Sequence, residues 1–224
     1  MEKLSGFHAA DAAGLPRGKH SLLPHETREL QHRRIVRAAI TAFAEEGYHT
    51  TTISSIVKNA RVSRQVFYDL FSTKEECFLA AEKLGREGLM NSMAPSMIQQ
   101  GVSIEGDSWL RTPIKNYLQI CTEEPLFARA WTLEFPNATP RTLAQRNAFF
   151  IELATLFKFG HQLIRVKEPD HWLPVPDAFY EAAIGGAFEL IFRCISQNRF
   201  QDLPLLEDTL VHFILTTLGY KFDT

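Results

Sequence analysis

The sequence lacks the features that mark membrane and secreted proteins. No apolar run approaches the roughly 18 residues that a membrane-spanning helix needs, and the first stretch of the chain has no continuous apolar block of the signal-peptide type. Only three cysteines occur, Cys77, Cys121 and Cys194, and their wide spacing indicates neither a disulfide framework nor a zinc site. We therefore expect a cytoplasmic protein with no metal site and no membrane partner.

Motifs of the common enzyme classes are also missing. The eight histidines include no His-Glu-x-x-His pattern, and the chain has no Gly-x-Ser-x-Gly and no phosphate-binding loop. No cysteine, serine or aspartate has a partner at the spacing of a catalytic motif. The sequence therefore predicts no catalytic residue and no cofactor, and an enzyme is kept only as an alternative that turnover assays would detect.

Strand signals are absent beyond residue 88, where the apolar residues follow helical spacing. With 45% hydrophobic and 22% charged residues, the composition is that of a globular chain with one core, or two that share a boundary. We predict an all-α fold. Helical patterns cover about 108–122, 125–135, 140–166, 177–197 and 204–219, with breaks at Pro95, Gly101, Gly106, Pro136, Pro169, Pro174, Pro176 and Pro204.

Short helices with recognisable ends are predicted nearer the N-terminus. The first covers about 26–46 and stops at Gly47, Thr51 or Thr52 caps the second, and Ser63 caps the third. Two overlapping capping boxes then begin a fourth helix. Two short helices that are joined by a tight turn and covered by a preceding helix form a helix-turn-helix unit, whose second helix enters the DNA major groove.

The third helix has a polar face that its apolar residues do not need. Phe67 faces the core, which leaves Arg64, Gln65 and Tyr68 on the other side, with Val66 near the boundary. Arginine pairs with guanine, glutamine with adenine, and valine contacts a thymine methyl group, whereas the tyrosine hydroxyl suits a phosphate. The alternative is an ordinary solvated helix face.

Lys74 lies where a cation is unfavourable. In the first turn of a helix it opposes the macrodipole at a cost of about 0.3–1 kcal/mol, unless an anion is bound there. A DNA phosphate would be attracted by the helix amides, the dipole and the ammonium together. Thr51 and Thr52, at the start of the second helix, are predicted to donate to phosphate in the same way.

The run from Arg28 to about Ala81, AAITAFAEEGYHTTTISSIVKNARVSRQVFYDLFSTKEECF at its centre, resembles the DNA-binding domain of the tetracycline-repressor (TetR) family. The motifs A-F-x-E-x-G-Y-x-x-T-T, I-x-x-I-x-x-x-A, V-S-x-x-x-F-Y-x-x-F and S-x-K-E-x-x-F carry the resemblance together. It implies a homodimeric bacterial transcription regulator. The expected parts are a flexible arm (1–24), a helix-turn-helix domain (25–76) and a helical effector-binding and dimerisation domain (77–224).

The resemblance also assigns roles to individual residues. It puts Tyr68 and Lys74 on phosphates and the residues at the start of the third helix in the groove of a double-stranded operator. The full predicted DNA-binding set is Thr51, Thr52, Arg61, Ser63, Arg64, Gln65, Val66, Tyr68 and Lys74.

Two residues depart from the family pattern. Arg61 stands where the turn commonly has glycine, which costs roughly 1–2 kcal/mol if the residue is left-handed, or it supplies another phosphate contact. Asp69 puts a carboxylate on the recognition helix, where the DNA backbone repels it unless it accepts from a cytosine amino group or pairs internally. The operator sequence is therefore not readable from the chain.

Aromatic residues are concentrated after residue 76, where all three tryptophans lie. An apolar effector pocket with a few orienting polar groups is one interpretation, and a plain aromatic core is the other. The predicted effector-binding residues are Trp109, Tyr117, Trp131, Asn147, Phe150, His161 and Phe188.

The last two helices are predicted to form a dimer interface. The final helix is apolar on nearly every face, and Gly185 and Gly186 in the helix before it cost about 1 kcal/mol each unless another helix approaches closely, in the same chain or across a two-fold axis. The predicted interface residues are Ala183, Gly186, Ala187, Leu206, Leu210, Phe213 and Ile214.

These parts together predict a repressor whose operator binding is released by a small-molecule effector, because a ligand that prefers a misaligned dimer weakens DNA binding. A TetR-like activator and an effector-independent regulator are alternatives within the family. Outside it stand a helical small-molecule-binding protein and a helix-turn-helix domain that binds protein instead of DNA.

Overall fold

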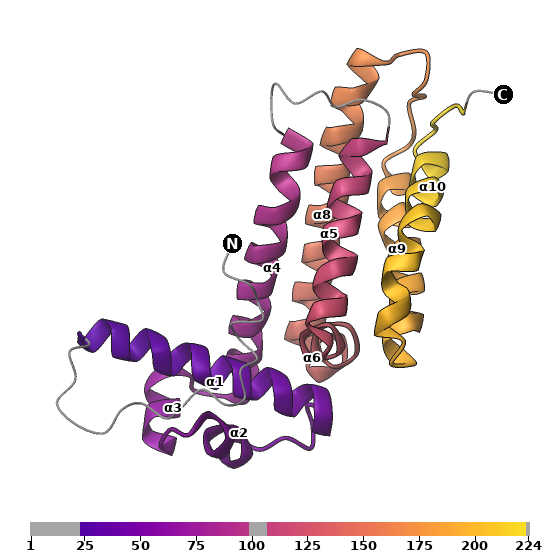
Figure 1. The fold of residues 1–224 in the computed structure, drawn as a ribbon. Coiled ribbons are helices and arrows are strands. Elements are labelled where there is room, and N and C mark those ends of the chain that lie inside the picture. Colours follow the sequence, from indigo (N-terminus) through magenta and orange to yellow (C-terminus); the bar gives the residue numbers. More distant parts are fainter. Residues whose placement is uncertain (1–22, 99–106, 223–224) are drawn as a thin grey trace. The chain divides into compact units, whose positions relative to one another are not determined.

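The computed structural model describes residues 23–98 and 107–222, with the backbone alone at 91–98. The predicted all-α fold is confirmed: the described residues contain helices and one isolated bridge between Trp172 and Tyr220, but no strand. The helices are α1 (Pro24–Glu46), α2 (Ile53–Ala60), α3 (Arg64–Leu70), α4 (Lys74–Ile98), α5 (Ser108–Glu123), α6 (Pro125–Arg129), α7 (Phe135–Ala138), α8 (Pro140–Lys167), α9 (Ala178–Ser196) and α10 (Glu207–Thr217) (Figure 1).

The contacts divide the chain into two compact units. The first contains the residues up to Gly85 together with 123–143, and the second contains 86–122 and the residues from Ala144 onward. Helices α4 and α8 each contribute residues to both units. The predicted N-terminal arm lies outside the described residues, apart from its last two positions. No helix in the described ranges has the length and hydropathy to cross a membrane.

The helix ends near the N-terminus follow local sequence signals. Helix α1 stops at Gly47, which has a φ of +84° that favours glycine. Thr52 caps α2, because its hydroxyl oxygen accepts from the Ser55 N–H at 3.1 Å, and Ser63 caps α3 in the same way. At the start of α4, Thr73 accepts from the Glu76 N–H at 3.1 Å, as one of the two predicted capping boxes requires.

The segment 125–135 was predicted as one helix that breaks at Pro136, and the structure divides it into three pieces. Helix α6 continues into a π-helical turn (Ala130–Glu134), which leads into α7 with Pro136 in its first turn. Because proline has no N–H, its first-turn position leaves no additional backbone donor unpaired. The prediction of a break at Pro136 is therefore wrong.

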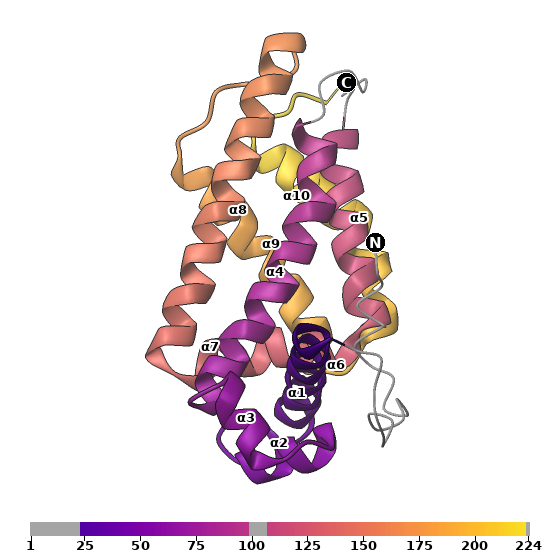
Figure 2. The ribbon, with the colours of Figure 1, turned by 90° about the vertical axis from the view of Figure 1, so that its left-hand side faces the viewer.

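The second unit is a bundle in which α5, α8, α9 and α10 run beside one another (Figure 2). Helix α4 passes through Pro95 to Ile98, so the predicted break at Pro95 is wrong too. A proline so near the end of a helix removes only one of its last hydrogen bonds, and α5 likewise contains Pro113. The last helix is preceded by a 3-10 segment (Phe200–Leu206) that includes Pro204.

Candidate nucleic-acid interface and effector cavity

Helix α3 presents most of its side chains to solvent. Phe67 is the one residue of this helix that is fully buried, whereas Arg64, Gln65 and Tyr68 are exposed. Val66 is half-buried. Within this face the Arg64 guanidinium approaches the Tyr68 hydroxyl at 3.5 Å. The polar face therefore contributes little to the core, and its side chains are accessible to a partner.

Asp69 pairs within the protein, which is one of the two arrangements predicted for its carboxylate. The Gln65 amide nitrogen donates to Asp69 Oδ1 at 2.7 Å, one turn away on α3. The Arg28 guanidinium of α1 donates to the Asp69 carbonyl at 2.9 Å and fixes the end of the helix. Gln65 therefore has to leave this carboxylate before its amide can make both hydrogen bonds to an adenine.

Arg61 adopts the left-handed conformation that the turn requires, with φ 54° and ψ 45°. Its N–H closes the end of α2 on the carbonyls of Val57 and Lys58. The strain of about 1–2 kcal/mol that glycine would avoid is therefore present. The side chains of Lys58, Arg61 and Arg64 are all exposed, and we call these three residues the basic edge.

Thr51 and Thr52 have different roles, and the prediction that Thr51 donates to phosphate is wrong. Thr51 is only 1% exposed, and its hydroxyl contacts the Gly47 carbonyl at 2.8 Å and the Ala42 carbonyl at 3.2 Å. It fastens the turn to the end of α1. Thr52 is exposed, and because its oxygen only accepts in the cap, its hydroxyl hydrogen remains available for a phosphate.

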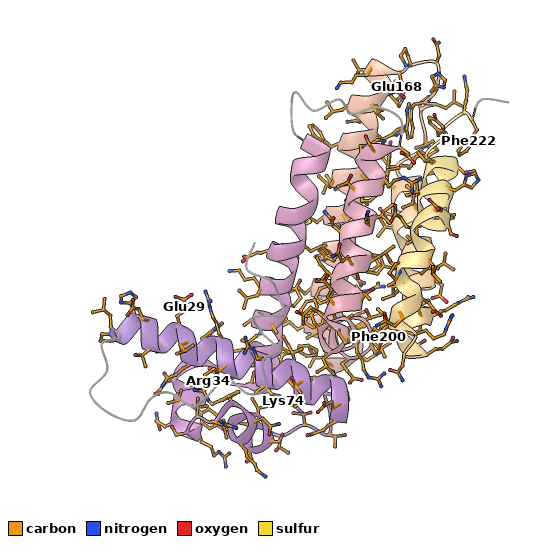
Figure 3. All side chains as sticks on the ribbon, viewed as in Figure 1. Glu29, Arg34, Lys74, Glu168, Phe200 and Phe222 are labelled. Atoms are coloured by element: carbon orange, nitrogen blue, oxygen red, sulfur yellow. The ribbon has the colours of Figure 1, made fainter. Side chains whose placement is uncertain are left out.

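Lys74 is used inside the first unit, so the argument that its charge needs a phosphate is wrong. Lys74 is labelled in Figure 3. Its ammonium donates to the carbonyls of Tyr48 at 2.6 Å and Thr51 at 2.9 Å, approaches that of His49 at 3.4 Å, and lies 4.4 Å from the centre of the Tyr48 ring. Burial lowers the pKa of Lys74. The carbonyl oxygens take the place of the expected anion, and the lysine braces the turn between α1 and α2.

The same turn is also held by Glu134 of the π-helical segment and Asn137 of α7, which no sequence pattern indicated. The Tyr48 N–H donates to Glu134 Oε2 at 2.8 Å, and His49 Nε2 lies 3.3 Å from the Asn137 carbonyl. Nearby, the Arg129 guanidinium donates to the Ala44 carbonyl at 2.8 Å. These contacts join positions more than 80 residues apart, which local spacing does not reveal.

Three of the four arginines of α1 have neighbours of the first unit that affect their charge or position. Arg33 pairs with Glu29 at 2.8 Å, and Arg28 holds the end of α3. Burial lowers the pKa of Arg37, and the nearby carboxylate of Glu124 acts in the opposite direction and raises it. Burial and the neighbouring Glu123 raise the pKa of Glu124 to about 7, against the effect of Arg37. Arg28 and Arg33 are thus engaged within the protein.

The second unit encloses a small apolar cavity of about 40 Å³ between its helices. All of the residues that line it belong to this unit, and every wall is apolar. Two predicted effector residues, Tyr117 and Phe188, are among them, with ring centroids 5.5 Å apart. The lining residues are Leu89, Pro113, Ile114, Tyr117, Leu153, Phe157, Ile184, Ala187, Phe188, Ile191, Leu210 and Ile214.

Phe150 and Asn147 of α8 do not line this cavity. The Phe150 ring packs on Phe188, with 4.4 Å between centroids, and the Arg146 guanidinium lies 3.8 Å from its centre on the other side. Asn147 is exposed and accepts from Arg146 at 3.2 Å. Burial lowers the pKa of Arg146. Phe150 therefore packs on a residue that lines the cavity but does not line it itself. The prediction of Asn147 as an effector residue is wrong.

Trp109, His161 and Trp131 do not line the cavity, and each is buried against other side chains of its own unit. Trp109 is buried against Phe157, and His161 is fully buried with Nδ1 2.7 Å from the Tyr180 hydroxyl. Burial lowers the pKa of His161 to about 4, so its ring is neutral at physiological pH. Trp131 stacks on another ring in the first unit, not the one with the cavity. The predicted effector role of these three residues is therefore not supported by position.

Most of the predicted dimer residues face the inside of their own unit. Ala183, Ala187, Leu210 and Ile214 are buried, and the last three line the cavity, so the prediction that they form an intermolecular surface is wrong. The space beside Gly186 is filled by the Phe213 ring of the same chain. Phe213 itself is 37% exposed, and Leu206 is half-buried. Because α10 is apolar on nearly every face, its sequence does not show which face is inside.

Part of the chain is similar in sequence to known proteins. Residues 35–81 match the model of bacterial regulatory proteins, tetR family. The chain is 30% identical over 94 residues to the uncharacterized HTH-type transcriptional regulator YezE of Bacillus subtilis, covering 38% of this chain and 48% of that protein. It is 40% identical over 48 residues to the HTH-type transcriptional regulator HbdR of an Aromatoleum species, covering 21% of each. The matched parts thus span about half and about a fifth of these relatives.

A solved structure extends the likeness to both units. The transcriptional regulator FadR from Bacillus subtilis, in complex with stearoyl-CoA, superimposes with a TM-score of 0.71 over 82% of this chain and 97% of its own, at 17% identity. At this identity the likeness shows the fold. The match of residues 35–81 to the family model agrees with the predicted resemblance of the helix-turn-helix unit to the tetR family of bacterial regulatory proteins.

Proposed function

We propose that the protein is a transcription regulator that binds an operator as a homodimer and releases it when an apolar effector enters the second unit. One observation carries the DNA-binding part: the polar face of α3 is exposed, while the turn between α1 and α2 in the same unit is braced by Lys74 and by Glu134. A rigid scaffold that presents polar side chains is what groove recognition needs.

The proposed contacts divide into two kinds. Arg64, Gln65 and Val66 at the start of α3 supply base contacts. Tyr68, Thr52 and the basic edge supply phosphate contacts, which position the protein without reading sequence. Ser63 keeps its hydroxyl on the cap of α3, where its hydrogen is available to a phosphate as well.

A mobility-shift assay with the DNA beside the protein's own gene tests this proposal. Arg64→Ala is expected to weaken the specific complex by about 1–3 kcal/mol and to reduce discrimination at one base pair, because it removes a bidentate base contact. Tyr68→Phe is expected to weaken binding to all sequences equally. A chain that binds no DNA, or binds it with the same affinity after Arg64→Ala and Tyr68→Phe together, contradicts the proposal.

The size of the cavity supports release by an effector. Sites for small molecules usually have volumes of about 300–1,000 Å³, whereas this cavity has about 40 Å³. An apolar ligand therefore has to separate the helices that line it, and it binds the widened state better than the closed one. That difference in affinity is the condition for a ligand to shift a conformational equilibrium. The FadR structure with stearoyl-CoA supports a long apolar effector.

Exposed aromatic and aliphatic residues on α9, the 3-10 segment and α10 support dimerisation through this surface. Phe179, Phe192, Leu205 and Phe213 are each at least 37% exposed. Gly185 belongs to α9 as well and has open space where a side chain would be. A glycine in a helix costs about 1 kcal/mol relative to alanine, and close approach of a second copy would offset that cost. We call Phe179, Gly185, Phe192, Leu205 and Phe213 the dimer face.

Gly185→Leu is expected to convert the protein to monomers and to abolish operator binding, because leucine occupies the space that the second copy would use. Gly88→Leu is the matched control, since Gly88 also lies in a helix with nothing around the added side chain. Both changes improve helix propensity. Sedimentation velocity that finds the same oligomeric state for both variants would exclude this face as the interface.

A further inference from the structure

Tyr117 combines a place in the cavity wall with a polar atom that the protein leaves unsatisfied. Tyr117 belongs to α5, and its ring is part of the apolar lining, next to the Phe188 ring. Its hydroxyl oxygen is buried, and no nitrogen or oxygen atom among the described residues pairs with it, while the Cys121 thiol offers only a weak sulfur contact. Burial, and to a lesser extent the Cys121 thiol one turn further along α5, raises the pKa of Tyr117 well above its ordinary value. The hydroxyl is therefore a neutral group that keeps its hydrogen.

An unpaired buried hydroxyl destabilises the folded chain, because it has lost its bonds to water and gained none in return. Phenylalanine has nearly the same shape and would fill the same place without this penalty. Tyr180 shows the usual arrangement in the same unit, since its buried hydroxyl lies 2.7 Å from His161 Nδ1. Tyr117 is thus suited to a partner that enters the cavity with the ligand.

We propose that Tyr117 selects the effector: its hydroxyl donates to a neutral oxygen, such as the carbonyl of a ketone, ester or amide, on a molecule whose apolar body occupies the widened cavity. The inference rests on the proposed effector role of this cavity. A charged carboxylate fits less well, because the wall surface of the cavity is apolar and none of the lining residues is a cation. Arg146 lies outside the lining, behind Phe150.

The test compares two ligands of the same chain length, 2-undecanone and undecane, through displacement of the neutral fluorescent probe N-phenyl-1-naphthylamine from the full chain. The ketone is expected to bind more tightly than the alkane. Tyr117→Phe should reduce that preference by about threefold to tenfold, the range of one hydrogen bond. Decanoate is expected to bind more weakly than the ketone.

The melting temperature of the protein without ligand provides a second test, in which Tyr117→Phe is expected to be favourable and not harmful. Tyr117→Phe removes an unsatisfied group, so its melting temperature is expected to rise. The control Tyr180→Phe should lower the melting temperature, because it leaves His161 Nδ1 unpaired, and should not change the ketone preference. A merely structural role for Tyr117 would instead make its variant less stable and leave the preference unchanged.

The outcomes separate this inference from the proposed function. An undiminished ketone preference in Tyr117→Phe, a preference for decanoate, or the absence of any binding by both neutral ligands overturns the inference. A preference that depends on Tyr117 upholds it, even if the ketone leaves the operator complex intact. In that last case the proposed release of DNA fails, while the assignment of Tyr117 stands.

Discussion

Lys74→Met is expected to lower the stability of the first unit by about 2–4 kcal/mol, since hydrogen bonds to a charged group contribute about 1.5–3 kcal/mol. The variant keeps the length of the side chain but removes the ammonium from the carbonyls of Tyr48, His49 and Thr51. Those carbonyls belong to the turn that leads into α2. The variant is therefore expected to lose at least about tenfold in operator affinity as well, because Thr52 and α3 are no longer held in place.

The salt dependence of operator binding shows whether Lys74 stabilises the turn before α2 or contacts a DNA phosphate. Each phosphate contact that is lost lowers the slope of log affinity against log salt by about one. Because Lys74 is used internally, we expect its variant to keep the slope of the parent protein while its melting temperature falls. Lys58→Met is the matched control: this lysine is exposed on the basic edge, so its variant should lose slope and keep its melting temperature.

The opposite result for Lys74→Met would support the phosphate contact that the sequence predicted for this residue. An unchanged melting temperature together with a slope reduced by about one would show that the ammonium reaches a phosphate when DNA is bound. The carbonyl contacts would then be those of the free protein alone. Thermal unfolding and a salt series measured on the same two variants decide between the readings.

The features of the helix-turn-helix unit that depend on neighbouring residues were predictable from the sequence. Ser63 was predicted as a cap, and one of the two candidates, Thr52, caps α2. The stop at Gly47 and the left-handed Arg61 also follow from rules that involve only a few adjacent positions. The periodic burial of Phe67 is of the same kind. Local patterns of this sort determine where helices begin and end.

The roles that depend on contacts between distant segments were not predictable in the same way. Lys74 and Thr51 carry the right chemistry for a phosphate, but carbonyl groups of the unit itself use them. Glu134 gave no signal, because its partner Tyr48 lies 86 residues away. A donor near a helix start therefore predicts a site only when its own fold leaves it available.

The second unit shows a related limit for apolar helices. When nearly every face of a helix is apolar, periodicity does not separate the face that packs inside from the one that meets a partner. Leu210 and Ile214 were therefore predicted at the dimer interface but line the cavity. Trp131 was counted with the effector residues because aromatic content alone does not show which unit a residue joins.

Ala187→Leu is expected to give a protein that binds its operator normally but requires much more effector for release. Ala187 lines the cavity from α9, beside Ile184 and Ile191. The larger side chain fills the void of the closed state, and each buried methylene contributes about 0.8 kcal/mol. Three added carbons then stabilise the closed state by about 2 kcal/mol, so roughly thirtyfold more effector is required for the same release.

The same substitution at an exposed position provides the control. Ala148 lies on the surface of α8 and does not line the cavity, so Ala148→Leu is expected to keep the effector response of the parent protein. Both variants are measured in a mobility-shift titration with 2-undecanone and in thermal unfolding. Only Ala187→Leu should raise the melting temperature, since filling a void restores dispersion contacts that its walls lack. Release at the parent's effector concentration by an Ala187→Leu protein that folds normally would place the effector elsewhere, because a filled cavity has no room for it.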